Sequence, residues 1–395
     1  MGVRDDFPIF RRMKESFVYL DNAATTQKPD AVIKRMEKYY SEENCNIHRG
    51  NYPLSRQAEA LYEHARETVR EWLDAADTEE IVFTQGCTGA INLVASSVGE
   101  TWMEPGDNCI VTELEHSSNY FSWKHQCDRC GAEFRVANAR QDGTVDEQEI
   151  LGKMDRRTRL IAVTAMSNVT GYRPKLEEII REAHRNGTMV LVDAAQAIAH
   201  ERISVRKLDC DFLCFSGHKV YGPMGTGVLY GKRRLLEEMK PYLYGGGMVE
   251  MPACGTAAYR TDAMKFEAGT QNIAGVLGLE AALEYLNETD FDRLAEEERR
   301  MARHLRARLQ AIHGIHVLGE EEDAPILSFT GKRLGAYDIG VLLGNRGIAV
   351  RCGEHCAYPL AEKIGGRSCR ISLGCYNTME EIDRTADVLE SICGK

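Results

Sequence analysis

Three groups that could act together chemically stand at the ends of apolar segments. Asp193 closes the run MVLVD, Lys219 follows the run DFLCFS in SGHKVYGPMGTG, and Gly86 precedes a helical pattern in FTQGCTGAINLVASS. Apolar neighbours such as Phe215 and Val220 could lower the pKa of the Lys219 amine and make it nucleophilic. Asp193 alone would be interpreted as a helix cap and Lys219 alone as a solvated charge. The interpretation therefore rests on the three groups together.

These groups match the needs of pyridoxal phosphate (PLP). This cofactor takes a lysine amine, a carboxylate at its ring nitrogen and a cradle for its phosphate. The free N–H groups of a helix that begins after Gly86, with Cys87 and Thr88 beside them, would attract the phosphate. The sequence therefore predicts a PLP enzyme.

Two further stretches contain paired cysteines. In RCGEHCAYP, residues 351–359, Cys352 and Cys356 are four residues apart, and the stretch alone leaves open packing thiols, metal ligands or a nucleophile. Cys127 and Cys130 form a CxxC, but a structural zinc site needs four ligands and the sequence has no second CxxC. We therefore expect a helix closed by Gly131 with incidental cysteines, and no metal.

The alternation of apolar runs and helical patterns predicts the fold. Buried strands are expected at 107–113, 159–166, 188–195, 211–216 and 226–231, with a helix at 175–187 between two of them. The later part predicts one long helix with Leu294, Met301, Leu305, Leu309 and Ile312 on one face, strands at 324–330, 347–353 and 370–376, and a final helix from about 379.

This pattern gives an α/β fold class with two expected domains. A mostly parallel-sheet large domain would span residues 15–275, and a smaller α+β domain residues 276–395, with residues 1–14 packed on it.

The chain resembles the fold type I, class V PLP enzymes, specifically the cysteine desulfurase and selenocysteine lyase branch. The resemblance runs over nearly the whole sequence. The segments that carry it are YLDNAATTQKP (19–29), NIHRG (46–50), GCTGAINLVA (86–95), ELEHSSN (113–119), SNVTG (167–171), VDAAQ (192–196), SGHKVYGPMGTG (216–227), FEAGTQN (266–272), RCGEHCA (351–357) and CRISLGCYNT (369–378).

The resemblance implies which residues hold PLP. Lys219 would hold it covalently, Asp193 would pair with its ring nitrogen, and His116 would stack on the ring and transfer protons. Further contacts to the phosphate, the ring and its hydroxyl would come from Cys87, Thr88, Asn168, Gln196, Ser216, His218 and, from the second subunit of a homodimer, Thr270.

The resemblance also implies the substrate side and the nucleophile. Relatives carry the nucleophilic cysteine in a loop of the form Arg-Thr-Gly-x-His-Cys-Ala, so Cys356 is the expected nucleophile, with His355 and Arg351 favouring its thiolate. The alternative for Cys356 is a buried small thiol. Arg370 would grip the substrate carboxylate. Other substrate contacts would come from Ala24, His48, Arg49, Asn168 and Arg351.

Four positions depart from the family pattern. Cys87 replaces a threonine of the phosphate loop, Cys352 replaces the threonine of the nucleophile loop, and Ala194 stands where relatives often have glycine. Glu354 stands where they commonly carry His or Gln, and its carboxylate would raise the pKa of Cys356 if it pointed inward.

The implied activity is removal of sulfur from L-cysteine, giving L-alanine and a persulfide on Cys356. An acceptor protein or scaffold would take this sulfur for iron–sulfur cluster or thio-cofactor synthesis. The alternatives are another class V reaction (selenocysteine lyase acting on L-selenocysteine, cysteine β-lyase or aminotransferase) and, from a different class, a non-catalytic thiol-bearing partner protein. Sulfide and alanine as products would favour removal of sulfur from L-cysteine. Pyruvate and ammonia as products would favour a β-lyase.

Charge and composition limit the partners and the compartment. The 49 basic and 60 acidic residues leave a formal charge of −11, which argues against a nucleic acid or an anionic membrane as the main partner. Thirteen cysteines, an odd number spread along a long chain, fit reduced thiols better than a disulfide framework. With no apolar run long enough to cross a bilayer, we expect a cytoplasmic protein.

Overall fold

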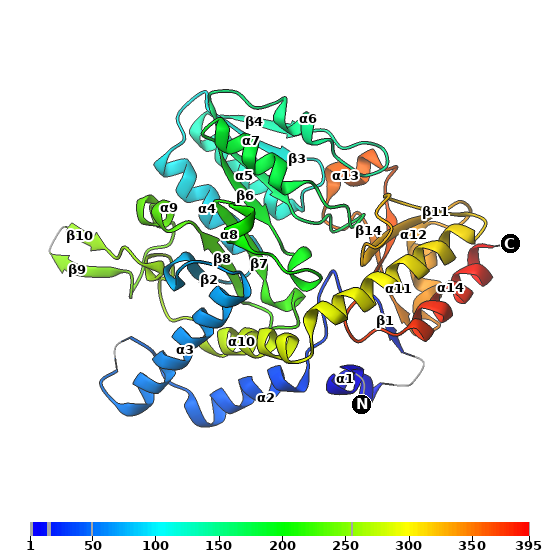
Figure 1. Cartoon of the computed structure of the whole chain (residues 1–395), viewed down its shortest axis with the longest axis horizontal. Coiled ribbons are helices and arrows are strands. Elements are labelled where there is room, and N and C mark those ends of the chain that lie inside the picture. Colours follow the sequence, from blue (N-terminus) through cyan, green and yellow to red (C-terminus); the bar gives the residue numbers. More distant parts are fainter. Residues whose placement is uncertain (1–2, 14–16, 49, 254–255, 395) are drawn as a thin grey trace.

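The large sheet is the platform of the molecule. The computed structural model describes residues 3–13, 17–48, 50–253 and 256–394 (Figure 1). Within these residues the large sheet has the order β2-β8-β7-β6-β5-β3-β4. The strands from β7 to β4 pair in parallel, whereas β8 is antiparallel to both β7 and β2. The expected mostly parallel sheet is confirmed.

Side chains alternate between the two faces of this sheet, and each face has its own core. On β5 (Thr158–Thr164), Ile161 and Val163 pack with α3, α7 and α10, whereas Leu160 and Ala162 pack with α4 and α5. Because both faces are covered, the central strands are nearly continuous apolar runs. For this reason the central strands could be predicted from continuous apolar runs, without an alternation of apolar and polar residues.

The helices and strands of the large sheet and its layers have the following bounds. They are α2 (Asp30–Lys38), α3 (Pro53–Trp72), β2 (Ile81–Thr84), α4 (Cys87–Thr101), β3 (Asn108–Thr112), α5 (Ser117–Cys130), β4 (Glu133–Ala137), α6 (Glu147–Leu151), α7 (Leu176–Arg185), β6 (Met189–Asp193), α8 (Val205–Leu208), β7 (Phe212–Ser216), β8 (Gly227–Gly231), α9 (Arg233–Glu238), β9 (Val249–Ala253), β10 (Thr256–Tyr259) and α10 (Ile273–Glu288). The β9–β10 hairpin projects at the left edge of Figure 1.

A second, antiparallel sheet of order β11-β12-β15-β14 lies at the other end of the molecule (Figure 1). Its elements are α11 (Phe291–Ala311), β11 (Ile315–Val317), β12 (Ile326–Gly331), α12 (Ala336–Gly344), β13 (Ile348–Ala349), β14 (Arg351–Gly353), α13 (Tyr358–Lys363), β15 (Ser368–Ser372) and α14 (Met379–Cys393). Helix α11 buries Leu294, Met301, Leu305 and Leu309, the face that the sequence predicted.

The N-terminal segment joins the two parts. Its helix α1 (Pro8–Arg12) follows Phe7, which packs against Tyr221, Tyr285 and Tyr376. Strand β1 (Val18–Tyr19) pairs with β13 in a separate two-stranded sheet, so the start of the chain lies against the C-terminal part. The expected boundary at residue 275 falls within α10, and the division into 15–275 and 276–395 stays a prediction.

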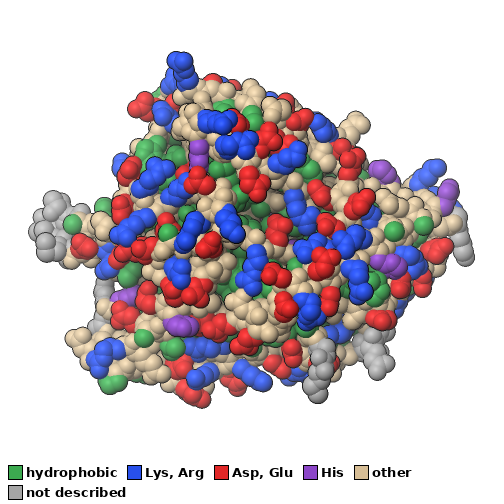
Figure 2. Space-filling model, viewed as in Figure 1, with side chains coloured by type: hydrophobic (Ala, Val, Ile, Leu, Met, Phe, Trp, Pro, Cys, Tyr) green, Lys and Arg blue, Asp and Glu red, His purple; other side chains and the backbone are tan. Residues whose placement is uncertain are grey.

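Two expectations on cysteines and the surface can be compared with the structure. Helix α5 ends at Gly131 with φ of 67°, as expected for a glycine cap, and the described cysteines are all free thiols. Figure 2 shows acidic and basic side chains intermixed over one face of the molecule. In the described part of the chain, no helix is long and apolar enough to cross a membrane.

Candidate active site

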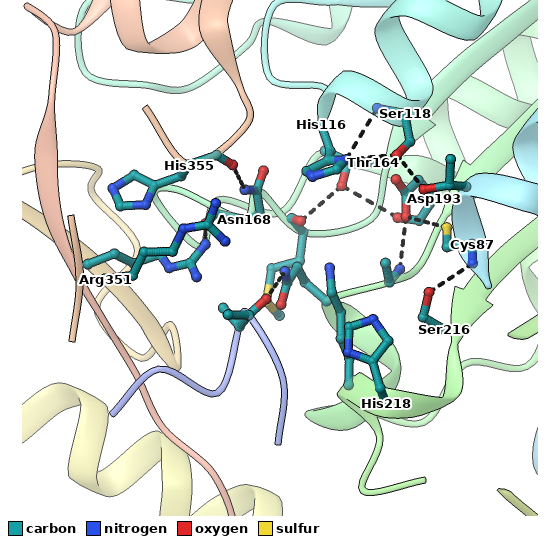
Figure 3. A pocket seen from close by; sticks show the side chains of 18 residues that line it. Cys87, His116, Ser118, Thr164, Asn168, Asp193, Ser216, His218, Arg351 and His355 are labelled. Carbon is teal, nitrogen blue, oxygen red and sulfur yellow. Dashed lines mark hydrogen bonds between the residues drawn. The ribbon is translucent and has the colours of Figure 1, made fainter. Parts of the chain in front are cut away.

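A cavity of about 190 Å³ lies where the two sheets meet, at the carboxyl ends of β5, β6 and β7 (Figure 3). The first turns of α4 and α5 form one wall, and the Ala23–Ala24 turn forms another. Arg351, His355 and Arg370 reach it from the second sheet and its loop. The carboxyl ends of parallel strands are the usual ligand site of such sheets.

Asp193 and Lys219 are brought together because β6 and β7 are neighbouring parallel strands. Both side chains line the cavity. Burial lowers the pKa of Lys219, although the carboxylate of Asp193 works in the opposite direction, so the neutral amine becomes more accessible. The Asp193 Oδ1 atom accepts hydrogen bonds from the Ala195 N–H at 2.9 Å and from the Cys87 thiol at 3.3 Å. These contacts fix the orientation of the carboxylate.

The Cys87 side chain has a different environment from the one expected. The sequence placed it in the phosphate loop, but its thiol points to Asp193, while its backbone N–H donates to Ser216 Oγ at 2.8 Å (Figure 3). Burial, followed by the negative charge of Asp193, raises the pKa of this thiol well above its ordinary value. Cys87 is therefore a neutral donor to the carboxylate.

The first turn of α4 and the residues around it are suited to a phosphate. Helix α4 follows its N-cap Gly86, whose φ of 141° favours glycine and which has no side chain to bond to the helix. Thr88 Oγ1 lies 2.7 Å from Ser118 Oγ at the same end. His218 Nδ1 is buried without a hydrogen-bond partner among the described residues. Burial, then the charges of Lys219 and Lys28, lowers the pKa of His218 to about 4, so this imidazole is neutral.

His116 is the N-cap of α5 and lies beside Ser118 (Figure 3). Its Nδ1 accepts a hydrogen bond from the Ser118 N–H at 3.2 Å, which assigns the ring proton to Nε2. Burial, followed by the charge of Lys219, lowers the pKa of His116 to about 4. A neutral, flat ring fixed at the cavity wall can stack on a cofactor and exchange a proton through Nε2.

Arg370 is a fully buried guanidinium at the substrate side. Its Nη1 donates to the backbone oxygen of Asn168 at 2.8 Å, and its Nη2 lies 3.2 Å from Asp21 Oδ1. Its Nε is buried without a partner among the described residues. Burial lowers the pKa of Arg370 to about 10, which leaves it charged at neutral pH. A carboxylate bound here would satisfy the remaining donors.

The nucleophile loop lies at the mouth of the cavity. Arg351 Nη2 is 3.3 Å from the Cys356 sulfur, whereas Cys356 itself is partly exposed and is not among the residues that line the cavity. His355 and Cys356 have φ values of 54° and 58°, a region that non-glycine residues rarely adopt. The Ser117 N–H and hydroxyl both donate to the Cys356 carbonyl, at 2.7 and 2.8 Å.

One expectation about this loop needs correction, and one condition set for it is not met. His355 was expected to favour the Cys356 thiolate, but its Nε2 lies 3.1 Å from the Ser368 carbonyl and burial lowers its pKa to about 3. It is therefore neutral, and Arg351 is the positive group beside the thiol. The Glu354 carboxylate is 2.6 Å from Arg367 Nε, away from the cavity, and this bond lowers the pKa of Glu354.

The remaining expected residues fall into two groups. Ala24, Thr88, Asn168, Gln196 and Ser216 line the cavity with the residues already described. The Gln196 amide donates to the Ala23 carbonyl at 3.0 Å, and the Asn168 amide donates to the His355 carbonyl at 2.7 Å.

Three expected residues are not brought to this cavity within one chain. Thr270 lines a separate cavity of about 170 Å³ before α10. His48 lies in another, where its Nδ1 is 3.1 Å from Glu59. Arg49 lies outside the described residues. The roles predicted for these three residues stay predictions.

Sequence reasoning missed residues that act on the expected ones. Asp21 holds Arg370, Ser118 holds both His116 and Thr88, and Thr164 lines the cavity at the end of β5. Ser118 could have been predicted from the sequence, because a serine two residues after an N-cap histidine can donate a hydrogen bond to the imidazole ring. Asp21 could not, because its partner is 349 residues away in sequence.

These residues fit PLP. The buried Lys219 amine and the Asp193 carboxylate, together with the first turn of α4 and His218 Nδ1, which has no partner among the described residues, form the donor and acceptor set that the cofactor requires. Arg370 also lines the cavity, and its role toward a substrate stays a prediction.

Comparison with known proteins gives a consistent result. Residues 18–385 match the family described as aminotransferase class V. A cysteine desulfurase of Pectobacterium carotovorum is 42% identical over 394 residues, covering 99% of this chain and 97% of that protein. One from Escherichia coli is 41% identical over 394 residues, covering 99% of this chain and 97% of that protein.

Solved structures agree with this assignment. The cysteine desulfurase CsdA of Escherichia coli superposes with a TM-score of 0.91 at 37% identity, covering 98% of this chain and 96% of that chain. The cysteine desulfurase of Thermococcus onnurineus superposes with a TM-score of 0.94 at 32% identity, covering 99% and 97%. The chain therefore belongs to the cysteine desulfurase family of the class V aminotransferases, the fold type I enzymes that use pyridoxal phosphate.

Proposed function

We propose that this protein is a cysteine desulfurase that transfers the sulfur of L-cysteine to Cys356. The observation that carries the proposal is the pairing of a buried Lys219–Asp193 site with a cysteine that lies 3.3 Å from Arg351 at the cavity mouth. An aminotransferase or a β-lyase needs the first feature and has no use for the second.

The buried groups prepare the α-carbon of the substrate. When bound, PLP withdraws electrons from the substrate and makes its α-hydrogen acidic. Lys219, whose pKa is lowered by burial, can take that proton and return it, and Asp193 keeps the ring nitrogen of the cofactor protonated. The neutral His116 would stack on the cofactor ring and could exchange a proton through Nε2.

Arg370 orients the substrate. A bidentate contact with the α-carboxylate would use the donors that its bonds to Asn168 and Asp21 leave, including the buried Nε. Because Arg370 lies on β15 of the second sheet and Lys219 follows β7 of the large sheet, a substrate held by both would lie between the two parts of the chain.

Cys356 then accepts the sulfur. Its thiolate attacks the substrate sulfur, a new S–S bond forms, and the C–S bond of the substrate breaks. The substrate carbon gains a proton, so L-cysteine and one thiol give L-alanine and one persulfide. The positive charge of Arg351 favours the attacking thiolate. Since Cys356 does not line the cavity, its loop has to shift for the attack.

The homodimer and the sulfur acceptor are part of this proposal. Leu243 and Tyr244, with 47% and 62% of their surface exposed, lie beside the cavity that contains Thr270, and a second subunit would cover them. An acceptor protein or scaffold, in iron–sulfur cluster or thio-cofactor synthesis, would take the persulfide from the partly exposed Cys356. A cytoplasmic location stays a prediction.

The test compares Cys356→Ala with Cys352→Thr as holoenzymes given L-cysteine, with and without reductant. Cys356→Ala should bind PLP, because no cofactor contact changes, and should lose alanine and sulfide formation. Cys352→Thr, a change on the same loop, should keep both. Fragment ions of the wild-type 351–359 peptide should place one added sulfur on Cys356.

Other products would overturn the proposal. Pyruvate and ammonia would indicate a β-lyase, and a strong preference for L-selenocysteine a selenocysteine lyase. A protein that binds no PLP would indicate a non-catalytic thiol protein. Wild-type alanine formation by Cys356→Ala would exclude the proposed nucleophile.

A further inference from the structure

A second pair of thiols lies at the base of the loop that carries Cys356. Cys352 on β14 and Cys369 on β15 are direct partners in the antiparallel ladder, and their sulfur atoms are 3.0 Å apart. Cys369 is fully buried, whereas Cys352 keeps partial exposure. The two strands enclose residues 353–368, which include the nucleophile.

This pair faces away from the cavity. The neighbouring ladder pair, Arg351 with Arg370, lines the cavity, and alternation along the strands turns Cys352 and Cys369 to the opposite face. There the sulfur of Cys352 packs against Gly340 of α12, where an added Cβ would lie 2.5 Å from it. The mechanism proposed above uses neither thiol.

The two thiols differ in reactivity. The contact between the two sulfur atoms lowers the pKa of Cys352, and the same contact together with burial raises the pKa of Cys369. The sulfur of Cys369 is also 3.0 Å from the Ala336 carbonyl. Cys352 is thus the accessible thiol that ionises first, and Cys369 is the buried thiol beside it.

We propose that Cys352 and Cys369 form a redox modification site that low-molecular-weight disulfides convert to a cross-strand disulfide. The Cys352 thiolate attacks one sulfur of the small disulfide, and one small thiol leaves. The Cys369 thiol then gives its proton to solvent and attacks the Cys352 sulfur, which releases the second small thiol. In total, two protein thiols and one small disulfide are converted to one protein disulfide and two small thiols. The protein sulfur atoms approach by about 1 Å.

The disulfide would connect both ends of the nucleophile loop. Cys356 has to shift to reach the cavity, and a covalent link between β14 and β15 restricts that shift. Oxidation should therefore slow sulfur transfer without releasing PLP. This consequence rests on the proposed function, whereas the disulfide itself does not.

The experiment incubates reduced holoenzyme in glutathione buffers of increasing oxidised fraction, blocks free thiols with N-ethylmaleimide, and maps peptides without reduction. We expect a Cys352–Cys369 cross-link and a severalfold loss of desulfurase activity. Dithiothreitol should reduce the cross-link and restore the activity. Cys369→Ser should instead accumulate glutathione on Cys352, because the resolving thiol is gone. Cys130→Ser, which removes another partly exposed thiol, should behave as wild type.

Several results would overturn the proposal. Maleimide labelling of both Cys352 and Cys369 in the most oxidising buffer would exclude the site, and so would a cross-link from Cys352 to Cys356. If Cys352→Thr lost activity under oxidation as the wild type does, the proposal that the disulfide restricts the loop would be wrong. A cross-link in a protein that makes no alanine would instead contradict the proposed function and leave the site standing.

Discussion

Arg351→Ala should reduce the reactivity of Cys356 before any substrate is present. The guanidinium Nη2 lies 3.3 Å from the sulfur. Two unit charges at that distance attract by about 1.3 kcal/mol at the dielectric constant of water and about 5 kcal/mol at an effective value of 20. Because Cys356 is partly exposed, the lower value is closer, and an interaction of that size corresponds to about a tenfold factor in the rate of a reaction at the sulfur.

The assay measures the rate at which iodoacetamide alkylates Cys356 in the substrate-free holoenzyme near neutral pH, with the modified peptide quantified by mass spectrometry. Arg351→Ala should alkylate threefold to tenfold more slowly, and Arg351→Lys should recover part of the rate because it keeps the charge. Arg367→Ala is the matched control, since that guanidinium pairs with Glu354 on the same loop. An unchanged rate in Arg351→Ala, or an equal decrease in Arg367→Ala, would refute the electrostatic argument.

Three more predictions concern the buried groups. Lys219→Ala should lose the visible absorbance of the covalently held cofactor, and borohydride trapping of PLP on another lysine would contradict the assignment. Asp193→Asn should keep PLP but slow alanine formation on the order of 100-fold, because an amide cannot hold the ring nitrogen protonated, and wild-type kcat would count against it. For His355, burial lowers the folded-state pKa from 6.5 to about 3, so the unfolded chain binds a proton first and stability falls as pH decreases through 6.5 toward 3. His355→Gln should show a shallower fall in urea midpoint over that range, and identical profiles would exclude this contribution.

Much of the site could be predicted because it follows from the order of strands. Asp193 and Lys219 stand at the ends of consecutive apolar runs, and consecutive runs in an α/β chain tend to become neighbouring strands. The register then brings their ends to one edge of the sheet. The same reasoning could not predict that β8 is antiparallel to β7, because a continuous apolar sequence does not indicate the direction of its strand.

Other features depend on contacts that sequence spacing does not encode. Cys87 was assigned to the phosphate by its position after Gly86, yet the geometry of the first helical turn directs its thiol to Asp193 and its N–H to Ser216. His355 was expected to act on Cys356, its neighbour in sequence. The positive φ of both residues separates their side chains, so the imidazole bonds to Ser368.

The position of Cys356 follows from two requirements on one thiol. In the proposed reaction it has to reach a substrate held by Lys219 and Arg370 inside the cavity, and it has to present the transferred sulfur to a second molecule outside. A cysteine fixed in the cavity wall would meet only the first requirement. A loop that keeps Cys356 at the mouth, with its carbonyl held by Ser117 and its thiol beside Arg351, can meet both if it shifts between them. The rare φ values at His355 and Cys356 cost about 1 kcal/mol or more each.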